Sequence, residues 1–371
     1  MTGSPLHHVS IIAGQARQNH QFYTDILGLR MVKQTVNFDD PSSYHLYYGD
    51  EAGTPGSLIT FFPWEHVAPG RLGVGETQET VFRVPEGALG FWLHRFLEKG
   101  VVHESIEKRF GQSALPFRDV HGTRLALVSV PGMEAEPAYT GGPVAADHAI
   151  RGLHGVSLLL EEAQPTADIL TEVFGYERGA TEDTTTRYTL PGNPKGGTID
   201  IRAVGGFLKP RPGGGTVHHI AFRARDDDEQ AAMVKRLSAE FGLQTTEQKE
   251  RKYFRSVYFR EPGHVLFEIA TDAPGFSIDE APDSLGTRLM LPEPFEPRIA
   301  TRSPYQTSRS KDRISPVSSS PSQITARLPV RPPRSRIETC CSRGCSVGGP
   351  ASSKRRSRVC AARYLLAMSE L

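Results

Sequence analysis

Along about the first 270 residues, short apolar runs typical of strands alternate with apolar residues spaced as on one face of a helix. Short apolar stretches such as Val9–Ala13 and His219–Arg223 have the length of strands, and each is followed by a one-sided helical stripe. Two or three further strands, such as Tyr44–Tyr48 in the first set, close each set. The pattern predicts an α+β fold made of four βαβββ units. These units lie near residues 6–63, 77–131, 152–205 and 215–272.

The predicted helices carry their own start and stop signals. In unit four, Asp226–Asp228 can cap a helix that Gly242 ends. In unit two, the helix should end before Gly100. The apolar stripes consist of Phe22, Tyr23, Ile26 and Leu27 in unit one, Leu89, Trp92, Leu93, Phe96 and Leu97 in unit two, and Val234, Leu237 and Phe241 in unit four.

The chain also repeats itself. Leu6–Ser10 (LHHVS) recurs 147 residues later as Leu153–Ser157 (LHGVS). Phe117–Gly122 matches Phe259–His264 at an offset of 142. Repetition at fixed offsets indicates duplicated structural units. We therefore expect an N-terminal domain over residues 5–131 and a related C-terminal domain over 152–297. A Pro- and Gly-rich linker, residues 132–151, should form an exposed connection between them.

Charge divides the chain at about residue 297. Residues 1–297 hold 28 Lys and Arg against 39 acidic residues, whereas residues 298–371 hold 15 against three. An acidic body without a basic stripe argues against a nucleic-acid partner. The second segment is rich in Ser, Arg and Pro and lacks periodicity, which predicts a disordered basic tail. The abrupt change fits an out-of-frame coding segment, or else a genuine tail for an anionic partner.

All four cysteines lie in this tail, so disulfides and thiolate ligands are excluded from the body. Their spacing lacks the paired CxxC of common zinc sites. No run of about 18 apolar residues predicts a membrane span, and no secretory signal is visible. We expect a cytoplasmic protein without a membrane partner.

Comparison of the repeats singles out three residues. His8 corresponds to Gly155, Glu268 corresponds at offset 142 to Ala126, and His219 corresponds at offset 140 to Glu79. One copy thus carries His, His and Glu where the other carries Gly, Glu and Ala, which suggests one functional and one lost site. Taken singly, each histidine could be a hydrogen-bonded core residue, and Glu268 could pair with an arginine.

Two imidazoles and one carboxylate form the facial triad of non-haem Fe(II) oxygenases. Such a triad leaves three coordination positions open. A carboxylate flanked by Leu266, Phe267 and Ile269 is also costly to bury without a partner. We therefore predict a metal site at His8, His219 and Glu268.

Several stretches resemble one known family. The chain looks like the vicinal oxygen chelate superfamily, which includes glyoxalases, bleomycin resistance proteins and extradiol dioxygenases, and within it the hydroquinone-type ring-cleaving dioxygenases. The resemblance covers about residues 5–297. It rests on Leu6–Ser10, Tyr44–Tyr48, Gly53–Gly56, Arg109–Gln112, His218–Phe222 and Tyr258–Glu268.

The resemblance implies Fe(II) at His8, His219 and Glu268, and an aromatic ring opened with O2. It implies that His7, His218, Arg251 and Tyr258 line the substrate pocket. It also implies two half-open barrels, one of units one and four and the other of units two and three. His218 and Tyr258 are then candidates for acid–base catalysis, and Arg251 for stabilising an anion. For His7 the alternative is a structural role, because its repeat partner His154 is retained in the other copy.

The turn after Arg260 decides where Tyr258 points. A two-residue loop would place Ser256 or Val257 opposite Glu268, whereas an odd loop such as Pro262–His264 places Tyr258 on the metal side. We predict the odd loop.

Three other functions remain open from the residues. A catechol extradiol dioxygenase would use the same metal. A glyoxalase-like lyase or isomerase needs a fourth ligand, for which the sequence offers no obvious second Glu. A non-catalytic sequestration protein needs no triad. The expected partners are a small aromatic substrate and O2, and a homo-oligomer is compatible with the sequence.

Overall fold

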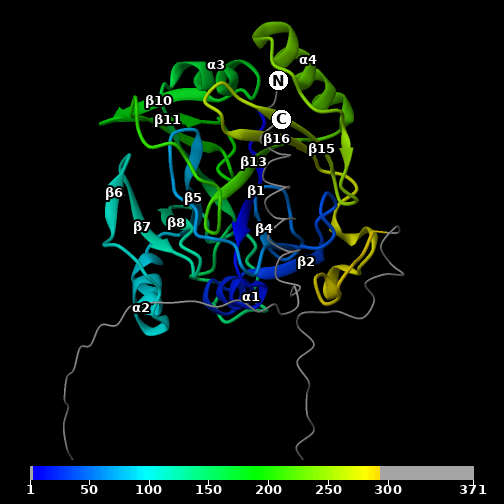
Figure 1. The fold of residues 1–371 in the computed structure, drawn as a ribbon. Coiled ribbons are helices and arrows are strands. Elements are labelled where there is room, and N and C mark those ends of the chain that lie inside the picture. The colour runs from blue at the N-terminus through cyan, green and yellow to red at the C-terminus, as the bar shows by residue number, and fades with distance from the viewer. Residues whose placement is uncertain (1–2, 293–371) are drawn as a thin grey trace, which may run out of the picture.

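The computed structural model describes residues 3–292 and contains four βαβββ units, as predicted (Figure 1). Unit one consists of β1 (Leu6–Ala13), α1 (Ala16–Gln21), β2 (Arg30–Val36), β3 (Tyr44–Gly49) and β4 (Leu58–Pro63). Unit two consists of β5 (Glu76–Pro85), α2 (Leu89–Lys99), β6 (Glu107–Arg109), β7 (Gln112–Arg118) and β8 (Arg124–Val130). The predicted tail and its cysteines lie outside the described residues.

The second half of the chain repeats this order. Unit three consists of β9 (Leu153–Leu160), α3 (Gln164–Glu172), β10 (Glu177–Glu182), β11 (Thr185–Thr189) and β12 (Thr198–Ala203). Unit four consists of β13 (Val217–Ala224), α4 (Asp227–Phe241), β14 (Lys249–Glu250), β15 (Arg255–Arg260) and β16 (Leu266–Thr271). Two short 3₁₀ turns, Phe276–Ile278 and Pro282–Ser284, follow β16. None of the described helices is long and apolar enough to cross a membrane.

The units pair across the halves of the chain. One eight-stranded sheet has the order β14-β15-β16-β13-β1-β4-β3-β2, so it joins units four and one. The other has the order β10-β11-β12-β9-β5-β8-β7-β6 and joins units three and two. We call these the first cup and the second cup. The predicted pairing of units one with four and two with three is confirmed.

The helix signals in the sequence are largely confirmed. Asp226 caps α4 by accepting a hydrogen bond from the Glu229 amide, and Gly242 ends the helix in the left-handed conformation. Gly100 ends α2 in the same way. The stripe of unit one behaves differently, because α1 stops at Gln21 and Phe22–Ile26 continues as a π-helical turn. This turn buries Phe22 and Tyr23.

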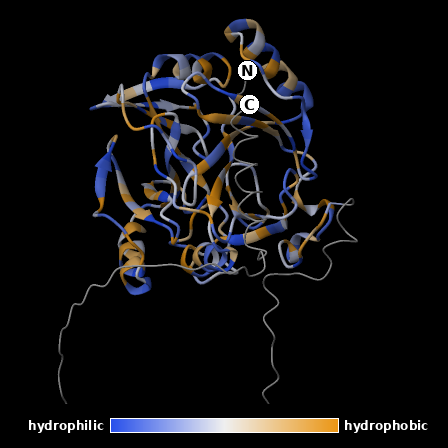
Figure 2. Cartoon of the chain, in the orientation of Figure 1, coloured by the Kyte–Doolittle hydropathy of each residue, from blue (hydrophilic) through white to orange (hydrophobic). Residues whose placement is uncertain are grey.

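The helices lie at the periphery in Figure 1, and Figure 2 shows apolar residues on the central strands and on α2. Residues 132–151, the predicted linker, are only partly exposed, and five of them are buried: Met133, Val144, Ala149, Ile150 and Arg151. After β16 the chain returns to the edge strand β2, where Leu289 bridges to Gln34. Buried Lys33 holds this return segment through Asp279 and Glu280, each 2.6 Å from its Nζ. The return segment therefore covers one edge of the first cup.

Candidate metal centre and adjoining pocket

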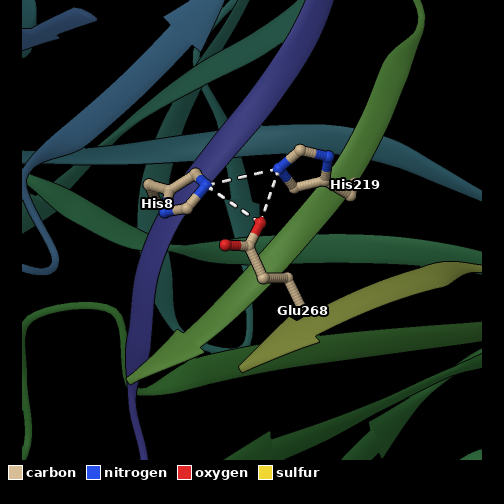
Figure 3. A group of neighbouring side chains, drawn as sticks. All are labelled: His8, His219 and Glu268. Carbon is tan, nitrogen blue, oxygen red and sulfur yellow. Dashed lines mark hydrogen bonds and ion pairs between the residues drawn. The ribbon is translucent and has the colours of Figure 1, made fainter. Parts of the chain in front are cut away.

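His8, His219 and Glu268 converge inside the first cup (Figure 3). They come from β1, β13 and β16, three adjacent strands of the sheet. Glu268 Oε2 lies 2.9 Å from His219 Nε2 and 3.4 Å from His8 Nε2, and the two Nε2 atoms are 3.3 Å apart. All three side chains are almost fully buried. Within residues 3–292, this is the one group of three such side chains with metal-ligand spacing.

A second histidine contacts each of the two candidate ligand histidines. His7 Nδ1 lies 3.0 Å from His8 Nδ1, and His218 Nδ1 lies 2.7 Å from His219 Nδ1. If each ligand histidine carries its proton on Nδ1 and donates it to this neighbour, its Nε2 lone pair faces the centre. Two such lone pairs and a carboxylate oxygen then meet without a proton between them. A bound cation would remove that repulsion, so the donor set fits a metal ion.

The electrostatics favour the ligand form of these residues. Burial, together with neighbouring His8, lowers the pKa of His7 to about 3. Burial also lowers the pKa of His219, although Glu268 opposes the shift. Burial alone would raise the pKa of Glu268, but His8 and His219 outweigh it and hold that pKa well below its usual range. Neutral imidazoles beside an ionised carboxylate are what metal binding requires.

The carboxylate has one further support. Ser256 on β15 donates a hydrogen bond from Oγ to Glu268 Oε1 over 2.5 Å. This contact leaves Oε2, the oxygen nearest the two histidines, without a hydrogen-bond partner among the described residues. A buried carboxylate oxygen without a donor is costly, which is a second reason that the donor set fits a cation.

Unit one contains no fourth ligand. Units one and four correspond, with His8 of β1 matching His219 of β13 and Ser10 matching Ala221. Thr60 pairs with Ser10, just as Glu268 pairs with Ala221. Thr60 therefore occupies the position where a second carboxylate would stand, and it hydrogen-bonds to Ser10 Oγ at 2.7 Å.

The predicted odd hairpin is present. Tyr258 pairs directly with Glu268, and the Glu261 amide donates to the Val265 carbonyl around Pro262–His264. His264 takes a positive φ of 74°, which closes this three-residue loop. Tyr258 thus lies on the metal side, and burial raises the pKa of its hydroxyl above its usual value, with Glu268 adding to the effect. Tyr258 is therefore protonated at neutral pH.

A pocket of about 370 Å³, including its open mouth, adjoins the triad. His218, Arg251 and Tyr258 line it, as the sequence suggested, and Arg251 Nε donates to Tyr258 Oη over 3.3 Å. His7 is not among the lining residues. It lies behind His8 and is buried against Phe254, with their ring centroids 5.2 Å apart.

Sequence reasoning missed seven further lining residues. They are Asn37, Phe38, Asp39, His45, Tyr47, Phe62 and Phe254. His45 and Tyr47 lie within Tyr44–Tyr48, a stretch that the sequence comparison already singled out. In the structure, His45 is held between the Tyr47 hydroxyl at 2.7 Å and Thr60 Oγ1 at 2.9 Å. The loop residues 37–39 carry no periodic signal that could have revealed them.

The second cup confirms the residue correspondence drawn from the repeats. His8 pairs with Ala221 and, equivalently, Gly155 pairs with Val81. In the same way, Ser10 pairs with His219 in the first cup, and Ser157 pairs with Glu79 at the matching positions of the second cup. Ala126 pairs with Val81 as Glu268 pairs with Ala221. The second cup therefore lacks all three ligands at the matching positions.

Comparisons with known proteins agree with this geometry. The model of the Glyoxalase/Bleomycin resistance protein/Dioxygenase superfamily matches residues 5–269. This chain belongs to that superfamily and, within it, to the ring-cleaving dioxygenases. A Bacillus subtilis (strain 168) protein named as a ring-cleaving dioxygenase, MhqO, is 45% identical over 292 residues, which cover 79% of this chain and 92% of MhqO.

Two further relatives extend the comparison. The chlorohydroquinone/hydroquinone 1,2-dioxygenase of Sphingobium indicum is 30% identical over 299 residues, 78% of this chain and 92% of that enzyme. The crystal structure of a protein named as a dioxygenase from Bacillus subtilis subsp. subtilis str. 168 superposes with a TM-score of 0.76 at 43% identity. It covers 80% of this chain and 94% of that one.

Proposed function

We propose that this protein is an Fe(II)-dependent dioxygenase that opens a hydroquinone-type ring with O2. The observation that carries the proposal is the set of three ligands, His8, His219 and Glu268, with Thr60 at the fourth position. Two histidines and one carboxylate suit non-haem Fe(II), and the open positions suit a substrate oxygen and O2. The hydroquinone activity of the Sphingobium relative supports the choice of substrate.

His8, His219 and Glu268 would hold the ferrous ion, which when bound supplies open coordination positions and a route for electrons from the ring to O2. Tyr258 is protonated and lies opposite Glu268, so its hydroxyl can donate a hydrogen bond to a substrate oxygen near the triad. His218 lines the pocket, and its Nδ1 contacts His219. If that Nδ1 accepts the His219 proton, the other nitrogen of His218 carries a proton, so His218 is a candidate proton donor to a substrate oxygen.

Arg251 and His7 have different roles in this proposal. Arg251 remains cationic because Tyr258 and Asp39 outweigh the cost of its burial and raise its pKa above the usual value. Since its Nε donates to the Tyr258 hydroxyl, it can stabilise a phenolate oxygen that lies beside Tyr258. His7 acts through His8, whose ring it orients, so we assign it as a positioning residue.

The glyoxalase-like alternative is disfavoured by Thr60. A lyase or isomerase of that type uses a fourth protein ligand, and the hydroxyl of Thr60 is engaged by Ser10 and His45. A catechol dioxygenase would use the same three ligands, so it is the alternative that the experiment must separate.

The test begins with anaerobic purification and metal analysis, followed by O2 uptake with hydroquinones and with catechols. We expect one iron per chain and O2 uptake with hydroquinones. Uptake with catechols alone would support the alternative. Uptake with neither class from fully iron-loaded protein would contradict the dioxygenase proposal.

A further inference from the structure

A set of polar contacts runs along the pocket wall from Tyr258, the strand partner of Glu268, to Asp39 and Asn37. Tyr258 lies opposite Glu268, and Arg251 Nε donates to the Tyr258 hydroxyl. Arg251 Nη2 then donates to Asp39 Oδ2 over 2.8 Å, across 212 residues of sequence. The Asp39 amide in turn donates to Asn37 Oδ1 over 3.0 Å. Asn37, Asp39 and Arg251 all line the pocket, and we call them the distal clamp.

The charges of the distal clamp cancel. Arg251 is a permanent cation, and Asp39 forms a close ion pair with it. The Asp39 side chain is 32% exposed, against 10% for Arg251, so Asp39 lies at the mouth and Arg251 lies deeper. A ligand that reaches the distal clamp therefore meets a neutral ion pair instead of an isolated cation.

The distal clamp nevertheless retains hydrogen-bond donors. Asn37 is 3% exposed, and its Nδ2 has no partner among the described residues. Its Oδ1 is already used by the Asp39 amide, which fixes the orientation of the side-chain amide. A buried donor without an acceptor is costly, and in a pocket wall it is most simply satisfied by a ligand oxygen.

The pocket between the triad and the distal clamp has aromatic walls. Phe254 packs against His8 with ring centroids 5.2 Å apart, and Phe62 packs against His218 at 5.5 Å. Phe38 completes the aromatic lining. A flat ring would thus lie against aromatic side chains in a pocket that both the triad and the distal clamp line.

The geometry points to Asn37 and Asp39 as the residues that select a ring with a second, uncharged hydroxyl over a carboxylated ring. Asp39 is the residue that excludes carboxylated rings, because it neutralises Arg251 and would repel a second carboxylate placed beside it. Asn37 is the residue that binds the second hydroxyl. This inference rests on the proposed function and deepens it by naming the residues that select the substrate.

Asp39→Asn tests the charge argument. The amide keeps an acceptor for Arg251 but leaves its positive charge uncompensated, so carboxylated rings should be accepted. Asp40→Asn is the matched control, because within residues 3–292 the Asp40 side chain accepts hydrogen bonds only from Ser42. The probes are hydroquinone and 2,5-dihydroxybenzoate, and their dissociation constants are measured by calorimetry without O2 on the iron-loaded enzyme.

We expect the wild type and Asp40→Asn to bind hydroquinone more tightly than the carboxylated ring. In Asp39→Asn the ratio should shift toward the carboxylated ring by about tenfold or more, the scale of a hydrogen bond to a charged group. A ratio unchanged in a folded Asp39→Asn variant, or a wild type that prefers the carboxylated ring, would overturn the inference. O2 uptake is measured separately, so loss of the proposed function with an intact binding preference is recognisable.

Asn37→Leu tests the donor at nearly constant volume. Hydroquinone binding should weaken about tenfold, while phenol, which lacks the second hydroxyl, should bind as it does to the wild type. Equal effects on the two ligands would show that Asn37 only shapes the loop. If Asn37→Leu fails to fold, Asn37→Asp provides the second variant, since it keeps the acceptor for the Asp39 amide and removes the donor. It too should weaken hydroquinone more than phenol, and equal effects would again contradict the proposal.

Discussion

The two cups have the same order of equivalent strands, but different side chains line their interiors. In the first cup, His8, His219 and Glu268 face a pocket, and Ser256 supports the carboxylate. In the second cup the position of Ser256 is Ala114 and that of Glu268 is Ala126, and these two alanines pack with Val81 and Val128 in a small apolar cluster. The ligand-bearing surface of one cup is thus an ordinary packed interior in the other.

Polar residues of the second cup form ion pairs with one another. Glu79, at the position of His219, pairs with Arg109, and Arg187 pairs with Asp200 at 2.8 Å. At the position of His8, a Cβ added to Gly155 would lie 1.8 Å from the Thr198 carbonyl oxygen. The comparison shows that the duplicated fold does not by itself create a site, because the strands must also stay far enough apart for ligand side chains.

Removing a ligand should have the largest effect. His8→Ala, His219→Ala and Glu268→Ala should each abolish iron retention and O2 uptake, because two ligands cannot hold the ion against dissociation. Glu79→Gln alters the position matching His219 in the second cup and should keep a full complement of iron, as metal analysis after gel filtration would reveal. Stoichiometric iron in Glu268→Ala would refute the ligand assignment.

Building the ligands into the second cup should fail. The triple variant Gly155→His, Glu79→His and Ala126→Glu should remain at one metal per chain and lose at least about 1–3 kcal/mol of stability, because β9 and β12 leave no room for a side chain at residue 155. Urea unfolding and metal titration measure the two quantities. A second equivalent of tightly bound metal would mean that the cups differ only in their ligand residues.

Converting Ser256 to its second-cup counterpart should have a moderate effect. Ser256→Ala removes the donor to Glu268 Oε1 and should weaken metal affinity by about 10–100-fold, as is usual for residues that orient a ligand. Ala114→Ser in the second cup is the control and should leave metal affinity unaltered. Competition with a chelator measures both, and equal affinities in the two variants would remove Ser256 from the metal centre.

The smallest effect is a pH dependence of stability in the second cup. Burial, with Arg187 and Arg83 adding to it, lowers the pKa of His154 from 6.5 to about 3. Between these values the unfolded chain binds a proton that the folded protein does not, so stability falls as the pH drops below 6.5. His154→Leu removes this dependence and should gain about 2 kcal/mol relative to the wild type between pH 7 and pH 5. Denaturation of the metal-free proteins at both pH values measures the change, and parallel pH profiles would contradict it.

The sequence alone predicts much of this comparison. The offsets of 147, 142 and 140 correctly matched Gly155, Ala126 and Glu79 to the three ligands, because β-sheet registers preserve the spacing of duplicated strands. The odd hairpin correctly placed Tyr258. The repeat offsets and the loop length are both counts of residues along the chain, so a single sequence contains them.

Other parts of the site were not visible in the sequence. The ion pair of Asp39 with Arg251 joins residues 212 positions apart, and neither belongs to a periodic pattern. The π-helical turn at Phe22–Ile26 has the same apolar spacing as an α-helix. Placement of His7 behind His8 depended on ring orientation, which strand alternation alone does not determine.

The central claim is that the chain holds one metal ion, in the first cup alone. Crystals grown without O2 from iron-loaded protein would test it most directly, by anomalous diffraction at the iron edge. The account predicts one peak, bonded to His8 Nε2, His219 Nε2 and Glu268, and none near Gly155, Glu79 and Ala126. A peak in the second cup, or none between the three ligands at full iron loading, would contradict it.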